Sequence, residues 1–352
     1  MRGTSGPLLE VEDLHCSFLT PRREVRAVDG VTFALDPGES LGVVGESGSG
    51  KTVTALSMLR LFGPASKVRL SGRATFEGVD LLRASPSHLR KVRGGRIGVV
   101  FQDPLTSLDP VVPVGEQIAE AIRLHKDVTR KEARRKAIDL LERVGIPDPG
   151  GRADDLPHRF SGGMRQRIMI AMAISCDPQL LIADEATTAL DATVQAQILA
   201  LLLELRRDMG MAMLVISHDL GVVAALCDTV QVMYAGRLAE RAPTKPLLET
   251  PAHPYSEALV RLVPKLDDRT HHRLRPIPGQ PPVWVSAAPG CRFAPRCERS
   301  IDRCDDHTPP LTEIAPGHTA WCWKAETPVL STPMDLSGTR GWTERDEQEV
   351  HP

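Results

Sequence analysis

A glycine-rich octapeptide directly after a short apolar segment is the feature that most restricts the fold of this chain. Residues 41–44 are apolar and are typical of a buried strand, and they precede Gly45-Glu46-Ser47-Gly48-Ser49-Gly50-Lys51-Thr52. In such a loop, backbone N–H groups curl around phosphate oxygens, the lysine ammonium faces the terminal phosphates and the threonine hydroxyl can ligate Mg²⁺. The pattern therefore predicts a strand, a phosphate-binding loop (P-loop) and a helix over residues 52–62.

Two further segments in the middle of the chain fit the same chemistry. Residues 180–183 form an apolar strand that ends in Asp184 and Glu185. The first carboxylate is placed to hold the water shell of Mg²⁺, and the second is placed to orient an attacking water. Upstream, a serine and two glycines open an expected helix and form a second anion-binding helix N-terminus: Ser161, Gly162 and Gly163. One polypeptide cannot fold both helix N-termini around the same phosphate.

In this order, the P-loop, the Ser161-Gly162-Gly163 segment and the Asp184-Glu185 pair resemble the ATP-binding subunits of ABC transporters over residues 8–265. The resemblance implies that Gln102 is a Q-loop glutamine that helps to hold Mg²⁺ and that His218 contacts the γ-phosphate. It also implies a head-to-tail dimer with a second ABC ATPase, itself or a related subunit. In that dimer the ATP bound by one P-loop would be contacted by Ser161, Gly162, Gly163, Met164 and Asp191 of the other subunit.

Two positions depart from the commonest family pattern. Met164 stands where a glutamine is usual, and Ala186 stands where a proline is usual. Neither change removes a charge or a backbone donor from the ATP site, so activity is expected to survive.

The resemblance and the hydrophobic pattern together predict the fold class. We expect an α/β P-loop NTPase of the ABC ATPase type, with a parallel-sheet core and an antiparallel β subdomain from residues 8–33. A charged helical subdomain is expected at residues 105–177 and a hairpin at residues 230–240. The expected domains are residues 1–265 for ATP binding, 266–325 for a Cys-rich irregular extension, and 326–352 for a disordered tail.

Charge and hydropathy restrict the partners and the location. The net charge of −2 and the pI of about 6.6 give no overall basic field, so no nucleic-acid partner is expected. No apolar run reaches the roughly 18 residues that a spanning helix needs, and the first residues lack the apolar segment of a signal peptide. The chain is therefore expected to be peripheral, at the cytoplasmic face of the cell membrane.

The seven cysteines fall into two groups. Cys16, Cys176 and Cys227 lie in apolar or mixed segments and are expected to be buried thiols. The other four lie close together in a Pro- and Arg-rich stretch, which in a cytosolic chain suggests metal binding: Cys291, Cys297, Cys304 and Cys322. Four thiolates suit either zinc or an iron–sulfur cluster. The nearby His271, His272, His307 and His318 are expected to be surface residues.

Three segments near the C-terminus carry a narrower resemblance. Residues 251–255, 276–282 and 290–297 resemble the tail of the oligopeptide/dipeptide importer branch. That resemblance implies a 4Fe-4S cluster on the four cysteines, with zinc as the alternative, two membrane permease subunits and an extracytoplasmic solute-binding protein. The alternative functions are the motor of a nickel or other small-solute importer and a soluble ABC-type ATPase that acts on nucleic acid or ribosomes. The tail is expected to fold separately from the P-loop, so that loss of the cluster would leave ATP binding little changed.

Overall fold

A computed structural model describes residues 6–21, 23–63, 66–188, 190–263, 277–280, 282 and 289–325. His271, His272 and the expected tail at residues 326–352 lie outside these ranges. Within them, no helix combines the length and the apolar character that crossing a membrane requires.

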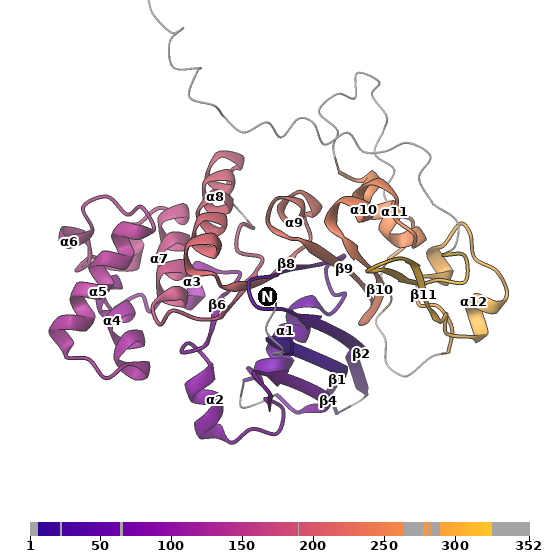
Figure 1. Cartoon of the computed structure of the whole chain (residues 1–352), viewed down its shortest axis with the longest axis horizontal. Helices are drawn as coiled ribbons and strands as arrows, with labels where there is room; N and C mark the ends of the chain where they lie inside the picture. The colour runs from indigo at the N-terminus through magenta and orange to yellow at the C-terminus, as the bar shows by residue number, and fades with distance from the viewer. Residues whose placement is uncertain are drawn as a thin grey trace, which may run out of the picture.

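An eight-stranded sheet forms the centre of the molecule (Figure 1), with strand order β11-β12-β10-β9-β3-β8-β7-β6. The five strands from β9 to β6 are parallel, and β10, β12 and β11 continue the sheet in antiparallel pairing. Parallel strands are covered on both faces, which explains the continuous apolar runs seen in the sequence. The bounds are β3 (Ser40–Val44), β6 (Ile97–Val100), β7 (Leu180–Asp184), β8 (Ala212–Ser217), β9 (Thr229–Tyr234) and β10 (Arg237–Pro243).

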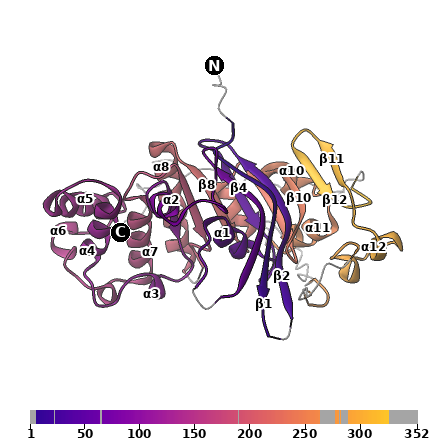
Figure 2. The same cartoon turned by 90° about the horizontal axis from the view of Figure 1, so that it is seen from below.

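A second, antiparallel sheet packs against one face of the central sheet, as Figures 1 and 2 show. Its order is β2-β1-β4-β5, with β1 (Leu9–Leu19), β2 (Glu24–Leu35), β4 (Val68–Phe76) and β5 (Val79–Asp80). Leu41 and Val43 of β3 share one buried cluster with the inner side chains of this sheet and with helix α1 (Lys51–Leu59). The antiparallel β subdomain was expected, but β4 and β5 were not, although residues 68–76 alternate apolar and polar side chains as a half-buried strand does.

Helices cover the other face of the central sheet and form a lobe at its β6 side (Figure 1). The segment expected to be a helical subdomain contains α3 (Pro104–Ser107), α4 (Val114–His125), α5 (Arg130–Arg143), α6 (Pro149–Arg152), the 3₁₀ turn η1 (Pro157–Arg159) and α7 (Gly162–Ile174). The remaining helices are α2 (Pro86–Val92), α8 (Ala192–Met209), α9 (Leu220–Leu226), α10 (Thr244–Glu249) and α11 (Pro254–Arg261).

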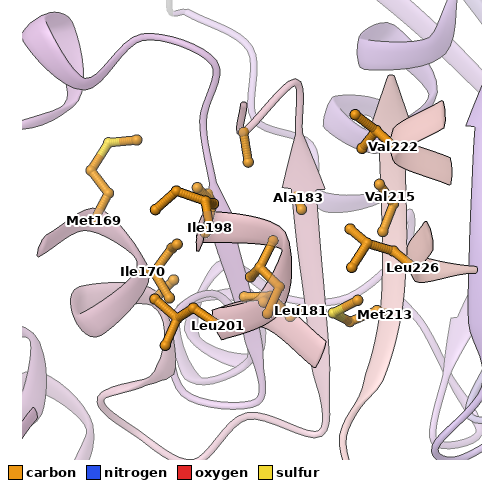
Figure 3. Close-up of a cluster of buried hydrophobic side chains, with 14 of the residues drawn as sticks. Met169, Ile170, Leu181, Ala183, Ile198, Leu201, Met213, Val215, Val222 and Leu226 are labelled. Atoms are coloured by element: carbon orange, nitrogen blue, oxygen red, sulfur yellow. The ribbon is translucent and has the colours of Figure 1, made fainter. Parts of the chain in front are cut away.

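One buried cluster joins the lobe to the central sheet. Figure 3 shows Ile170 of α7, Leu201 of α8 and Leu226 of α9 beside Leu181 of β7 and Val215 of β8. Because these side chains come from separate elements, the cluster fixes the starts of α7 and α8 relative to the ends of the strands.

The C-terminal region is not an irregular extension, which corrects the sequence-based expectation. Its described part contains η2 (Ala294–Arg296), α12 (Arg303–Asp306), β11 (Leu311–Ala315) and β12 (His318–Trp321). Strand β12 pairs with β10, with Glu240 opposite Ala320, so this region extends the central sheet. The expected domain limits stay a prediction, but the two parts share one sheet.

The prediction of His318 as a surface residue was also wrong. His318 is buried, and its Nε2 lies 2.7 Å from an oxygen of the fully buried Glu240. The same oxygen, Oε1, also accepts from the backbone N–H of Ala252, and Oε2 accepts from the backbone N–H of His253. A carboxylate that is buried away from water needs hydrogen-bond partners, and His318 at the start of β12 supplies one of them. His307 is exposed, as expected.

Candidate functional site

The P-loop connects the buried strand β3 to helix α1, and its backbone requires glycine. Gly45, Gly48 and Gly50 have φ values of 154°, 78° and 102°. A Cβ atom at Gly45 would lie 2.2 Å from the Met233 carbonyl oxygen, and one at Gly50 would lie 2.5 Å from the Ala27 carbonyl oxygen. The loop therefore packs closely against the backbone of neighbouring segments. It leads into the N-terminus of α1, where unpaired amides and the helix dipole favour anions.

Lys51 and Thr52 begin this helix. The Lys51 ammonium is buried and donates to the carbonyl oxygens of Gly45 at 2.8 Å and Glu46 at 3.1 Å. Burial lowers the pKa of Lys51, partly offset by Glu185 and Asp184. The Thr52 hydroxyl donates to Asp184 Oδ1 at 2.9 Å. The hydroxyl and carboxylate proposed as Mg²⁺ ligands are thus adjacent, although 132 residues separate them.

The carboxylates at the end of β7 have different surroundings. Asp184 is buried, and burial raises its pKa. The Thr52 hydroxyl and the nearby Lys51 ammonium lower the pKa of Asp184 but do not offset the effect of burial. Glu185 has a positive φ of 48° and is only partly buried.

Three side chains surround the Glu185 carboxylate. Gln102 Nε2 donates to it at 2.9 Å, Thr188 Oγ1 donates at 3.1 Å, and His218 Nδ1 lies 3.3 Å away. Strand β7 lies between β6 and β8 in the sheet. Gln102, Glu185 and His218 follow the ends of β6, β7 and β8, so they lie along one edge of the sheet. The carboxyl ends of parallel strands meet at that edge, which is where α/β folds bind ligands.

One pocket of about 820 Å³ contains most of these groups. The P-loop, Gln102, Glu185 and His218 all line it. Leu259 and Leu262, at the end of α11, line it too, and sequence reasoning missed them. They carry no motif, because apolar side chains at helical spacing are also typical of a core helix.

The Ser161 segment and Asp191 do not line this pocket. Ser161 Oγ accepts from the Met164 N–H and caps α7, while Asp191 Oδ1 accepts from the Val194 N–H at 2.9 Å and caps α8. The two helix starts lie close together, since a Cβ atom at Gly163 would lie 2.5 Å from Val194 Cγ1. The structure therefore brings Ser161, Gly162, Gly163, Met164 and Asp191 together, but away from the P-loop of the same chain.

The four C-terminal cysteines line a second, small cavity with His253 and Phe293. All four thiols are free, and the backbone N–H of Cys291 donates to the Cys304 carbonyl oxygen at 2.7 Å. Burial raises the pKa of Cys291 to about 11. Among the described residues, no three His, Cys, Asp or Glu side chains are arranged to hold a metal ion. The structure thus places the four thiols around one cavity without showing a metal site. Cys16, Cys176 and Cys227 are buried, as predicted.

The tail also contacts the P-loop, contrary to the expectation that the two fold separately. Arg296 donates from Nη1 to Glu46 Oε2 at 2.6 Å and from Nη2 to Glu46 Oε1 at 3.0 Å. The Glu46 N–H donates to the hydroxyl of Tyr255 on α11 at 2.8 Å. Sequence reasoning singled out Glu46 only as a P-loop residue, because nothing local to it indicates an arginine 250 residues away.

Comparisons with known proteins agree with this geometry. A family model described as ABC transporter matches residues 28–188, and one described as the C-terminal region of oligopeptide/dipeptide transporters matches residues 239–304. The chain is 50% identical over 333 residues to the probable peptide ABC transporter ATP-binding protein y4tR of Sinorhizobium fredii (strain NBRC 101917 / NGR234), covering 94% of this chain and 99% of that protein. It is 48% identical over 328 residues to the dipeptide transport ATP-binding protein DppD of Bacillus subtilis (strain 168), covering 92% and 98%.

Solved structures resemble about two thirds of the chain. The ATP-binding cassette MJ0796, in a dimeric post-hydrolysis state with ADP and phosphate, matches with a TM-score of 0.60 at 23% identity, over 67% of this chain and 98% of that one. The cbiO1 protein of Clostridium perfringens, part of the ABC transporter complex cbiONQ, matches with a TM-score of 0.58 at 27% identity, over 68% and 90%.

Proposed function

The chain belongs to the ABC transporter family, among the peptide ATP-binding subunits, and we infer that it is the ATP-hydrolysing subunit of an oligopeptide or dipeptide importer. The observation that carries this function is the single pocket in which the P-loop, Gln102, Glu185 and His218 meet. The relatives favour peptides over the nickel or other small-solute cargo considered above. Both family models describe transporters, which disfavours a soluble ATPase acting on nucleic acid or ribosomes.

The roles of the pocket residues follow from their contacts. The P-loop amides and Lys51 bind the phosphates of ATP, and Mg²⁺, held by Thr52, Asp184 and Gln102, would neutralise charge on the β- and γ-phosphates. The Thr52 hydroxyl and the Asp184 carboxylate are adjacent oxygen ligands of the kind that Mg²⁺ takes, so the residues present fit the ion. Glu185 accepts a proton from, and orients, the attacking water. His218 is placed to stabilise charge on the γ-phosphate.

Hydrolysis requires a second ATPase. The Ser161 segment and Asp191 lie outside the pocket of their own chain, which supports a head-to-tail dimer in which they complete the ATP site of the partner. Whether that partner is a second copy or a related subunit, the start of α7 supplies amides and a positive helix end to the γ-phosphate.

Two membrane permease subunits would carry the peptide across the membrane, and a solute-binding protein would deliver it from outside. Phe101, which precedes Gln102 in the chain, and Val111, which follows α3, are exposed apolar side chains that a permease helix could contact. Docked there, the subunit would be peripheral at the cytoplasmic face of the membrane. Movement of Gln102 on hydrolysis would then reach the permease directly.

The test of this function is transport by the reconstituted complex. The chain is purified with its permeases and partner ATPase, placed in proteoliposomes with external solute-binding protein, and supplied with internal MgATP. Uptake of a labelled dipeptide or oligopeptide is expected to depend on ATP and to stop in the Glu185→Gln variant. ATP-driven uptake of Ni²⁺ without peptide uptake would replace the peptide function with the small-solute alternative.

The thiol cavity is proposed to hold a 4Fe-4S cluster. The proposal is supported by four free cysteines around one cavity, a number that completes the ligand set of such a cluster. Cys291, Cys297, Cys304 and Cys322 would be the ligands, and zinc is the alternative occupant. When bound, the group would tie four separate points of the chain together and so stabilise the tail.

Anaerobic purification tests this assignment. The protein is expected to be brown, with iron and acid-labile sulfide in equal amounts, and Cys304→Ser is expected to bleach it and to speed proteolysis of residues 289–325. Cys176→Ser, a buried thiol outside the cavity, is the matched control. A colourless protein with one zinc per chain would replace the cluster with zinc, and a metal-free tail of equal protease resistance would defeat both assignments.

A further inference from the structure

We propose that Arg296 is a positioning residue of the ATP site: it neutralises Glu46 and holds the P-loop in its phosphate-binding form. The arginine directly precedes Cys297, so the Cys-rich tail takes part in nucleotide binding. The proposal requires only that the P-loop binds a nucleotide and is independent of the transported cargo.

The contact between Arg296 and Glu46 is a two-point ion pair. Both Arg296 Nη atoms bond one Glu46 oxygen each, and the arginine also donates to the Tyr234 hydroxyl at 3.2 Å and the Pro278 carbonyl oxygen at 2.6 Å. The side chain of Arg296 is only 5% exposed, against 25% for that of Glu46. Paired charge-assisted bonds of this kind fix geometry as well as charge.

The residues around Arg296 hold it against the core rather than in solvent. Phe293 packs edge-on against Tyr234, with ring centroids 5.2 Å apart, and lies 5.3 Å from the ring of Tyr255. Tyr255 in turn accepts from the Glu46 N–H. Arg292, which directly follows Cys291, is buried and pairs with Asp29 and with the Ala235 carbonyl oxygen. The segment between Cys291 and Cys297 is thus anchored at both ends beside the P-loop.

The chemistry of the loop explains why this pair matters. Glu46 is the second residue of the P-loop and lines the pocket that receives the phosphates. An unpaired carboxylate there would repel the nucleotide and would compete for the Lys51 ammonium, which already bonds the Glu46 carbonyl oxygen. Arg296 neutralises the Glu46 carboxylate and so removes this repulsion, although Arg296 does not itself line the pocket.

The experiment compares two substitutions of similar size in the full-length protein. The dissociation constant of a non-hydrolysable ATP analogue is measured by calorimetry for Arg296→Gln, which loses the charge, and Arg296→Lys, which keeps it. We expect Arg296→Gln to weaken binding about tenfold and Arg296→Lys to weaken it about threefold or less, because one of two bonds and the charge remain. The KM for ATP should rise with Arg296→Gln while kcat changes little.

A double substitution separates neutralisation from folding. If Arg296 acts by neutralising Glu46, Arg296→Gln combined with Glu46→Gln should bind the analogue more tightly than Arg296→Gln alone. Arg303→Ala, which removes a tail arginine stacked 3.7 Å from the Trp323 ring centroid, should leave affinity unchanged. Equal losses for Arg296→Lys and Arg296→Gln, or a double variant no better than Arg296→Gln, would overturn the proposal and reduce Arg296 to a structural contact.

Discussion

Individual side chains in the ATP pocket have separable roles, because binding and hydrolysis depend on different atoms. Lys51 bonds the carbonyl oxygens of the P-loop, whereas the Glu185 carboxylate contacts Gln102 and His218. In the proposed function, Lys51 acts in ground-state binding of the phosphates and Glu185 acts in the reaction. Substitutions should therefore change affinity and turnover independently.

Glu185→Gln is expected to keep ATP affinity within about threefold of wild type and to lower kcat by about 10²-fold or more, since a positioned base contributes that much. The amide can still bond Gln102 and His218 but cannot accept a proton. Calorimetry measures the affinity for ATP, and a steady-state ATPase assay measures kcat. Glu142→Gln, on the exposed surface of α5, is the control. Near-normal turnover would contradict the role of Glu185.

Lys51→Ala should instead weaken nucleotide binding at least about tenfold, because it removes the ammonium group expected to face the phosphates. Lys51 is the one basic residue among residues 45–52, and its ammonium lies within the loop, on the carbonyl oxygens of Gly45 and Glu46. Lys91→Ala, an exposed lysine on α2, is the matched control. The same calorimetric titration measures both. Unchanged affinity in Lys51→Ala would argue against phosphate binding at this loop.

At the scale of elements, buried ion pairs join segments that the sheet alone does not hold together. Asp29 of β2 is 3% exposed at its side chain and bonds Arg237 of β10 at 2.8 Å, Arg26 at 3.0 Å and Arg292 of the tail. Burial favours the neutral acid, but the guanidinium groups of Arg292 and Arg237 outweigh it and hold the pKa of Asp29 below its usual range. The antiparallel sheet, the central sheet and the tail thus meet at one carboxylate.

Asp29→Asn is expected to lower the free energy of unfolding at pH 7 by about 3 to 5 kcal/mol, since it leaves buried guanidinium groups without their anion. Because the folded pKa is depressed, the stabilisation is present above the unfolded value of 3.8 and is lost as pH falls through the folded pKa. Denaturant titrations at pH 7 and below pH 4 should therefore show the two proteins converging at low pH.

The control for Asp29 is an ion pair at the surface. Glu12→Gln breaks a half-exposed pair with Arg73 at 3.4 Å and should cost no more than about 1 kcal/mol. A loss in Asp29→Asn as small as in this control, or one that does not shrink with acid, would show that the Asp29 carboxylate does not join these elements.

At the scale of the whole molecule, the chain carries two candidate anion-binding sites that do not share a pocket. The P-loop pocket and the Ser161 segment both have helix N-termini suited to anions, yet they do not share a pocket. In the proposed dimer, the P-loop pocket binds nucleotide by itself, and the Ser161 segment acts only when two ATPases associate.

Ser161→Arg should therefore leave ATP affinity of the monomer within about threefold of wild type while abolishing ATP-dependent dimers. The measurement uses the Glu185→Gln background, with size-exclusion chromatography and light scattering in the presence of MgATP, and includes the copurified partner ATPase if the chain does not pair with itself. Ser87→Arg, at an exposed position of α2, controls for added charge. Loss of affinity in the monomer would place Ser161 in its own pocket.

Several features of this protein follow from the sequence alone because they depend on near neighbours. The glycines of residues 45–50, the apolar runs that became β3 and β7, and the Ser161-Gly162-Gly163 segment that opens α7 each restrict the backbone locally. A position that requires glycine and an apolar run typical of a strand buried on both faces can each be recognised without knowing which distant segments pack against them. The fold class and most of the pocket could be predicted for this reason.

Only the tertiary structure decided which polar groups meet. Gln102 bonds Glu185 across 83 residues, His318 is buried on Glu240 across 78, and Arg296 pairs with Glu46 across 250. Any arginine can pair with any carboxylate, so an ion pair leaves no periodic or local trace in a sequence. The parallel pairing of β6 with β7 brings Gln102 near Glu185, and the pairing of β12 with β10 places His318 opposite the strand of Glu240 and carries the Cys-rich tail onto the central sheet.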